Sequence, residues 1–271
     1  MTDPRRPDTG AELRALYEPE GGVRALFSAK VADYVASRPD YPAALFDRLE
    51  RAVPLSDGAT IADVGAGTGL LTQGFLARGH RVVAVEPNPA MREACDRHCG
   101  AYEKYRSVEG VAESMPLAAG SVDLVTAAQA FHWFDVDRAR VECLRVLAPR
   151  GKVALIWNDR DMGDPLHPAL DEVFKAFGGE KWSALVAHED RSHVQAFFGS
   201  ARQDVASWPH EHAIDGDGLV ALAFSRSYMP DRDSTEGARA ADALRRIFER
   251  FREDSVVKIR YRTILHLGRP E

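Results

Sequence analysis

The clearest structural signal in the chain is the segment Ile61-Ala62-Asp63-Val64-Gly65-Ala66-Gly67-Thr68-Gly69-Leu70. A compact apolar run that ends at Gly65 is typical of a buried strand, and helical spacing begins at Leu70. The glycines between them allow the backbone to turn sharply and to approach a ligand closely. This segment therefore predicts a strand, a tight turn and a helix, with a ligand at the turn.

Strands and helices continue to alternate after this segment. The runs that predict strands lie at 60–65, 81–86, 105–109, 122–127, 152–158, 203–208 and 256–267, and the helices between the first five lie at 70–78, 89–98 and 138–147. Alternation at this spacing indicates βαβ units and a parallel sheet. Apolar runs without polar alternation fit strands that helices cover on both faces. The sequence therefore predicts an α/β fold.

The pattern also suggests how the chain is organised. We expect a proline-broken flexible arm at 1–20, a cofactor-binding core with N-terminal lid helices at 21–160, a helical cap or substrate insertion at 161–200, and the C-terminal part of the core sheet at 201–271. Within these parts, helical spacing is found at 22–36 and 43–53 before the first strand, and at 234–251 before the last.

Composition excludes several classes of protein. The 271 residues are 45% hydrophobic and carry a formal charge of −6, which disfavours a nucleic-acid partner. No apolar run is long enough for a membrane span, and Arg5-Arg6 lacks the apolar stretch that an export signal needs. The three cysteines suggest reduced thiols and no metal site. We expect a cytoplasmic monomer or homodimer with no membrane or nucleic-acid partner.

The spacing of the glycines separates two kinds of cofactor site. A dinucleotide site has the pattern G-x-G-x-x-G, and counting from Gly65 its third glycine would fall at Leu70. The segment instead resembles motif I of class I S-adenosylmethionine-dependent methyltransferases. In that family the glycine loop contacts the methionine part of the cofactor, and the acid at the strand end, here Asp63, helps to orient its ammonium group. The implied loop contacts are Gly65, Ala66, Gly67 and Gly69.

A second mark is Glu86, which ends the strand predicted at 81–86. A carboxylate at this point can accept hydrogen bonds from two ribose hydroxyls, although dinucleotide enzymes place an acid here too and a solvated glutamate is the plain alternative. With the methyltransferase loop before it, ribose binding is the favoured interpretation. Pro87 and Met91 follow it and are expected to line the same cofactor site.

Two further segments extend the resemblance. The sequence at 110–117, with Ala112-Glu113, is similar to the family segment that lies along the adenine. The segments at 128–134 and 27–42 resemble the type-11-like branch of small-molecule methyltransferases, including trans-aconitate-methyltransferase-like proteins. In that branch Gln129 and Ala130 lie near the transferred methyl group, and Tyr34 and Arg38 come from a helix that lids the cofactor.

The resemblance also implies the fold and a set of candidate substrate residues. It implies a Rossmann-like, seven-stranded, mostly parallel sheet with an antiparallel last strand, helices on both faces and a helical cap insertion. His132 has the pKa range of a general base, while its aromatic neighbours equally fit a packing role. Tyr34 is the second candidate catalytic residue. The residues expected to face the substrate are His132, Trp133, Asn158 and Trp182.

The expected activity is methyl transfer from S-adenosylmethionine to a small organic molecule, either a secondary metabolite or an organic acid. Aromatic residues in the cap, Phe174 and Trp182 among them, suggest a partly apolar acceptor. A nucleic-acid amine methyltransferase would show Asn/Asp-Pro-Pro-Tyr after the fourth strand, where this chain has Ala128-Gln129-Ala130-Phe131. A nucleic-acid or protein methyltransferase and a non-catalytic cofactor-binding scaffold stay open as alternatives, and a dehydrogenase is disfavoured by Leu70.

Overall fold

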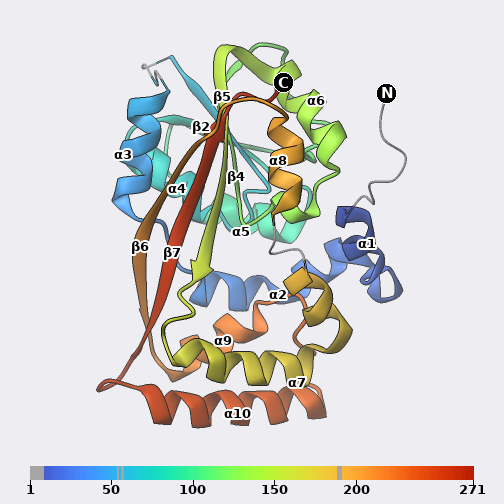
Figure 1. The fold of residues 1–271 in the computed structure, drawn as a ribbon, viewed down its shortest axis with the longest axis vertical. Helices are drawn as coiled ribbons and strands as arrows, with labels where there is room; N and C mark the ends of the chain where they lie inside the picture. The colour runs from blue at the N-terminus through green and yellow to red at the C-terminus, as the bar shows by residue number, and fades with distance from the viewer. Residues whose placement is uncertain (1–8, 54, 56–57, 188–190) are drawn as a thin grey trace.

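Seven strands form one sheet in the order β3-β2-β1-β4-β5-β7-β6 in this computed structural model, which describes residues 9–53, 55, 58–187 and 191–271 (Figure 1). The strands are β1 (Thr60–Val64), β2 (Arg81–Val85), β3 (Tyr105–Val108), β4 (Val122–Ala128), β5 (Leu147–Arg160), β6 (Asp204–Ile214) and β7 (Val257–Gly268). The first five pair in parallel, and β7 runs antiparallel to both β5 and β6. The predicted Rossmann-like sheet with its antiparallel last strand is confirmed.

Helices cover both faces of this sheet because its central strands are apolar on both sides. One face packs against α3 (Ala43–Ala52), α4 (Leu70–Ala77) and α5 (Pro89–Cys99). The other packs against α6 (Val136–Val146) and α8 (Ser192–Phe198). The carboxyl ends of β1, β4 and β5 therefore open at one edge of the core, where the glycine turn lies.

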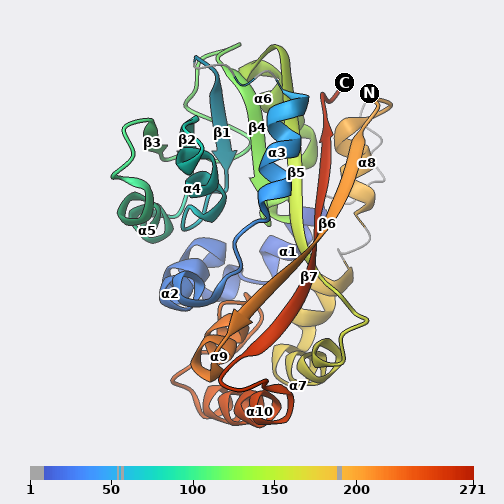
Figure 2. The same cartoon turned by 90° about the vertical axis from the view of Figure 1, so that its left-hand side faces the viewer.

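A second apolar cluster forms a lower lobe beyond that edge (Figures 1 and 2). The strands β5, β6 and β7 are long enough to continue past the core and reach it. Its helices are α7 (Leu166–Ala187), α9 (Gly216–Phe224) and α10 (Thr235–Phe251). None of the helices in the described ranges, α7 included, is long and apolar enough to cross a membrane.

The region 161–200 does not form the single cap that we expected. α7 belongs to the lower lobe, with Gly179 at a kink, whereas α8 packs on the face of the core sheet beside α6. The reason is apolar burial, since Val194, Phe197 and Phe198 on α8 are at most 2% exposed against that face. Likewise 201–271 supplies two strands of the sheet but also two helices of the lobe.

The flexible arm expected at 1–20 is wrong for residues 9–20. These residues form α1 (Thr9–Ala15) and a 3₁₀ turn, Glu18–Glu20, ahead of the long helix α2 (Gly22–Ser37). Leu13 and Tyr17 are fully buried. Prolines suggested a loose segment, but the apolar residues between them have partners far away in the sequence. Residues 1–8 lie outside the described ranges.

Candidate active site

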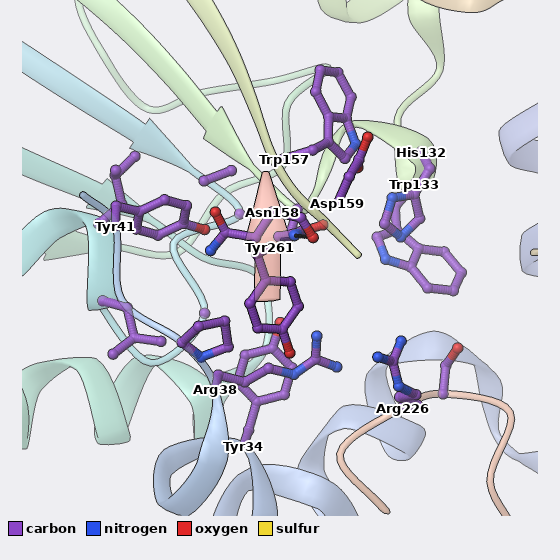
Figure 3. A pocket seen from close by; sticks show the side chains of 18 of the residues that line it. Tyr34, Arg38, Tyr41, His132, Trp133, Trp157, Asn158, Asp159, Arg226 and Tyr261 are labelled. Carbon is purple, nitrogen blue, oxygen red and sulfur yellow. Dashed lines mark hydrogen bonds between the residues drawn. The ribbon is translucent and has the colours of Figure 1, made fainter. Parts of the chain in front are cut away.

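A cavity of about 410 Å³ lies between the strand ends of the core and the lower lobe (Figure 3). Its walls come from the glycine turn, the end of α2, the segment after β4, the end of β5, and the loop after α9. Of the residues predicted from the sequence, those that line the cavity are Tyr34, Arg38, Asp63, Gly65, Ala66, Gly67, Gln129, His132, Trp133 and Asn158.

Two glycines give the turn beside the cavity a backbone conformation that other residues rarely adopt. Gly65 and Gly67 have φ values of +68° and +56°, which non-glycine residues rarely adopt. A Cβ at Gly65 would lie 2.6 Å from the Ala130 Cβ, so Ala130 packs behind the turn and does not line the cavity. A Cβ at Gly67 would meet no atom within 4 Å and would occupy open space.

Gly69 has a different role from the other two glycines. It precedes the first residue of α4 with φ of +88°, and a Cβ there would lie 2.7 Å from the Cys95 Sγ. Gly69 therefore lets α4 and α5 pack closely behind the turn, away from the cavity.

Asp63 is buried at the end of β1 and is held by two hydroxyl groups. The Oγ1 atoms of Thr72 and Thr126 donate to its carboxylate oxygens at 2.7 and 2.8 Å. Burial raises the pKa of Asp63, and these hydrogen bonds oppose that shift. The carboxylate is thus fixed in orientation beside the glycine turn.

Glu86 follows β2 and accepts two backbone N–H groups, from Gly67 at 2.9 Å and from Asn88 at 2.8 Å. Burial raises its pKa, and the two amides oppose the shift. Glu86 is 7% exposed and does not line the main cavity, because α2 packs over α5 and Ser28 hydrogen-bonds with Asn88. Each carboxylate oxygen still has a lone pair for another donor.

The remaining residues expected at the adenosine end also lie outside the cavity. Pro87 and the buried Met91 stand at the start of α5, next to Glu86. Ala112 is buried in the core cluster, and Glu113 accepts the backbone N–H of Asp135 at 2.7 Å. The cavity therefore includes the residues of the glycine turn but not those expected at the adenosine end.

Gln129 has a strained backbone at the end of β4. Its φ is +56°, which is uncommon for a residue with a side chain. Its backbone N–H donates to Ile156, and its Nε2 donates to the Asn158 carbonyl at 3.2 Å. These bonds tie the strand end to β5 and place the 3₁₀ turn with His132 and Trp133 against the cavity.

Two of the expected substrate residues have structural contacts: Asn158 lines the cavity but its side chain is held by hydrogen bonds, and Trp182 is packed in the lobe. The Asn158 side chain donates to the Asp40 carbonyl at 3.0 Å and accepts the Thr263 hydroxyl at 2.6 Å. It therefore joins β5 to β7 and to the loop after α2. Trp182 packs against the apolar cluster of the lower lobe and does not line the cavity, because its ring is used in that packing.

Four arginines line the same cavity: Arg38, which the sequence analysis predicted, and Arg160, Arg191 and Arg226, which it did not. Two of them have carboxylate partners. Arg191 pairs with Asp159 and lies 4.5 Å over the Trp157 ring, and Arg160 pairs with Asp171. These residues are far apart in sequence and carry no motif, so no local signal could have identified them.

The other two have no carboxylate partner among the described residues. Arg38 donates to the hydroxyl and the carbonyl of Ser225 at 2.9 and 3.2 Å, and its guanidinium lies 4.4 Å over the Tyr34 ring. Arg226 lies 4.7 Å over the Phe174 ring, and its Nε is shielded from solvent without a hydrogen-bond partner in the described chain. The cavity therefore has an excess of positive charge.

The residues at the turn fit S-adenosylmethionine. The open space beside Gly67 accepts a ligand in van der Waals contact with the backbone, and Glu86 retains acceptor capacity for hydroxyl groups. Leu70 begins α4 where the dinucleotide fingerprint would need glycine.

Comparison with known proteins gives the same result. Residues 62–155 match the family described as methyltransferase domain. The chain is 32% identical to an uncharacterized methyltransferase of Mycobacterium bovis, over 82% of this chain and 84% of that protein. It is 29% identical to an uncharacterized methyltransferase-like protein of Schizosaccharomyces pombe, over 88% and 93% of the two chains. A structure described as a type II methyltransferase from Anaeromyxobacter dehalogenans shares the fold, with a TM-score of 0.60 and 23% identity over 86% and 99% of the chains. The chain belongs to the class I S-adenosylmethionine-dependent methyltransferases.

Proposed function

We propose that this enzyme methylates a small organic molecule enclosed between the core and the lower lobe. The observation that carries the proposal is a continuous cavity of about 410 Å³ that joins the glycine turn to a wall of aromatic and arginine side chains. A macromolecular substrate needs an open path to the methyl donor. Here α1 and the lobe close over the same space, with Tyr17 bonded to Ser227 at 2.9 Å.

The proposed cofactor contacts follow from the geometry of the turn. When bound, S-adenosylmethionine supplies an electrophilic methyl group on a sulfonium ion. Residues 65–67 admit the ligand to the backbone, and Asp63 faces it with a fixed carboxylate. Glu86 is proposed to accept ribose hydroxyls, with Tyr34 and Arg38 closing the site from α2. Each of these roles is positional, and alignment is what a methyl transfer requires of the protein.

The aromatic wall would hold the acceptor. Trp133 and Trp157 line the cavity near the end of β4, where Gln129 is fixed by its bonds to β5. The Trp133 ring would contact the acceptor, and Trp157, with Arg191 over its ring, would help to exclude water from the reacting atoms. For an acceptor that loses a proton, we propose His132 as the group that takes it, since it lines the same part of the cavity.

The proposal is tested first by calorimetric titration with S-adenosylhomocysteine and separately with NADH. We expect micromolar binding of the first only. Glu86→Ala should weaken that binding by roughly 1–3 kcal/mol, because two hydroxyl donors lose a charged acceptor. The matched control is Glu109→Ala, which removes an exposed carboxylate that pairs with Arg92 of α5, the helix after Glu86. This variant should bind S-adenosylhomocysteine as the wild type does.

The acceptor class is tested by turnover with radiolabelled S-adenosylmethionine. Small-molecule extracts should be methylated at a rate that His132→Ala lowers, while protein and RNA fractions stay unlabelled. Methylation of RNA or protein without any small-molecule product would refute the proposal.

A further inference from the structure

The lower wall of the cavity concentrates positive charge that the chain does not neutralise. The guanidinium groups of Arg160 and Arg226 lie 5.8 and 4.7 Å from the centre of the same Phe174 ring. Asp171 pairs with Arg160, and no carboxylate pairs with Arg226 among the described residues. Asp171 lies near both guanidinium groups and supplies one negative charge for the two positive charges, so a second anion at this wall would be stabilised.

Arg226 is positioned to bind that anion. It follows α9 and, in Figure 3, its side chain points from the lobe into the cavity. Its Nε is inaccessible to solvent and has no hydrogen-bond partner in the described chain. Because Nε is not exposed to the cavity, an anion there would accept from the terminal N–H groups of the guanidinium, which lines the cavity. The planar fork of arginine matches the two oxygens of a carboxylate.

Two tyrosine hydroxyls stand beside this guanidinium. Tyr228 and Tyr261 both line the cavity, and each is 5% exposed. Burial raises the pKa of both phenols, while the nearby Arg226 opposes the shift. Both hydroxyls are therefore protonated near neutral pH and available as donors to an anion.

We infer that Arg160, Arg226, Tyr228 and Tyr261 form an anion subsite that binds a carboxylate of the methyl acceptor. The inference rests on the proposed function and specifies its substrate as a small carboxylic acid. Trp133 and Trp157 would hold the apolar body of that acid, with the carboxylate fixed on the lobe side of the cavity. The acceptor would thereby be oriented by an ion pair at one end and by aromatic contact along its length.

The carboxylate of the cofactor is the competing source of such an anion. Arg38 comes from α2, directly over the core edge, and stacks on Tyr34. Arg226 comes from the loop of the lower lobe and directly follows Ser225, the residue to which Arg38 is bonded. We therefore assign Arg38 to the cofactor side and Arg226 to the acceptor side, and the experiment separates the two.

The test uses the full chain saturated with S-adenosylhomocysteine and titrated with simple carboxylates. The probes are acids from propanoate to phenylacetate, each compared by calorimetry with its own primary amide. We expect at least one acid to bind at least about tenfold more tightly than its amide. Arg226→Gln should remove that preference, and Arg226→Lys should retain part of it, because lysine keeps the charge without the fork.

Controls separate this effect from misfolding and from loss of the cofactor. Arg232→Gln removes an arginine of the same lobe that pairs with Asp33 outside the cavity, and should keep the wild-type preference. Tyr228→Phe removes one hydroxyl and should weaken acid binding by a factor of about three or more. It keeps the inference testable if Arg226→Gln does not fold.

Three outcomes would overturn the inference. Acids and amides could bind equally, or no acid could bind to protein that does bind S-adenosylhomocysteine. Alternatively, Arg226→Gln could weaken S-adenosylhomocysteine as much as the acid, which would assign the arginine to the cofactor carboxylate. Failure of S-adenosylhomocysteine to bind the wild type is a separate result, and it would refute the proposed function itself.

Discussion

Gly67 and Gly79 offer a matched pair of residues with the same backbone constraint. Both have positive φ, +56° and +84°, and in neither case would a Cβ meet an atom within 4 Å. Alanine at either position should cost about 1–3 kcal/mol of stability through backbone strain. Only Gly67 lines the cavity, so Gly67→Ala alone should also lower the affinity for S-adenosylhomocysteine, at least about tenfold.

Calorimetry and urea denaturation of the two variants measure these effects separately. Equal cofactor affinity in both variants would show that the space beside Gly67 is not used by the cofactor.

Glu86 gives a prediction about pH. Burial raises its pKa above the ordinary value of 4.5, so this group takes up a proton at a higher pH than an exposed glutamate. The protonated form loses acceptor capacity for ribose hydroxyls. Affinity for S-adenosylhomocysteine should therefore fall as the pH is lowered through the raised pKa, and should be regained above it.

Titrations across an acidic pH series test this dependence. Glu86→Gln, which is uncharged at every pH, should bind weakly with a flatter profile, although Asp63 also has a raised pKa and adds its own slope. Glu109→Gln should keep the wild-type profile. A profile that is unchanged in Glu86→Gln would exclude this residue as the titrating group.

Single residues at the turn could be predicted from the sequence because one local motif fixes them. The segment that contains Asp63 and Gly67 has spacing that only a few folds use, and the structure brings both to the cavity. Arg226 could not be predicted, since its place in the cavity depends on residues far away in the sequence, Phe174 of α7 and Tyr261 of β7. Arginine on a loop has no periodicity that distinguishes a buried position from an exposed one.

At the scale of elements, a buried lysine of α2 hydrogen-bonds to the end of α9 and to the loop that follows it. The Nζ of Lys30 donates to the carbonyls of Phe224 and Met229 at 2.9 and 3.2 Å, and Lys30 is 8% exposed. Lys30→Met leaves both carbonyls without that donor in a buried interface. We expect a loss of about 1–3 kcal/mol in the free energy of unfolding, measured by urea denaturation.

The matched control is Lys104→Met. Lys104 also donates to a carbonyl, that of Gly79 at 2.9 Å, but its hydrogen bond is exposed to solvent. Its replacement should change stability by no more than about 0.5 kcal/mol. Equal losses in the two variants would mean that the bond between α2 and α9 contributes no more than a surface contact.

The elements of the core could be predicted closely, whereas in the lobe α10 was predicted from the helical spacing at 234–251 and α9 was missed. The strands from β1 to β5 and the helices between them follow apolar periodicity, which local burial dictates. α9 had no such signal, because its sequence is apolar on every side and six of its nine residues are buried. α8 could not be distinguished from α7 by pattern, since which surface a short apolar helix covers is a tertiary question.

For the whole molecule, the N-terminal segment connects the two bodies that enclose the cavity. Tyr17 is fully buried, and its ring lies 5.7 Å from Trp133 on the core side. On the lobe side its hydroxyl donates to Ser227 at 2.9 Å, and Lys181 of α7 lies 5.0 Å over its ring. One side chain thus contacts both walls of the acceptor site.

Tyr17→Ala should therefore act on stability and on acceptor binding together. Loss of a buried aromatic ring should cost about 3–5 kcal/mol, whereas Tyr17→Phe, which keeps the ring, should cost about 0.5–1.5 kcal/mol. Trp133 should become more exposed only in the alanine variant, which tryptophan fluorescence would report as a red shift. The affinity for S-adenosylhomocysteine should change little in both variants, because Tyr17 does not line the cavity.

If both variants lost stability equally, the hydroxyl bond to Ser227 would hold the lobe to the core. If only the alanine variant does so, packing of the ring between the two bodies holds them, and the acceptor site depends on a segment that precedes the cofactor motif by some fifty residues.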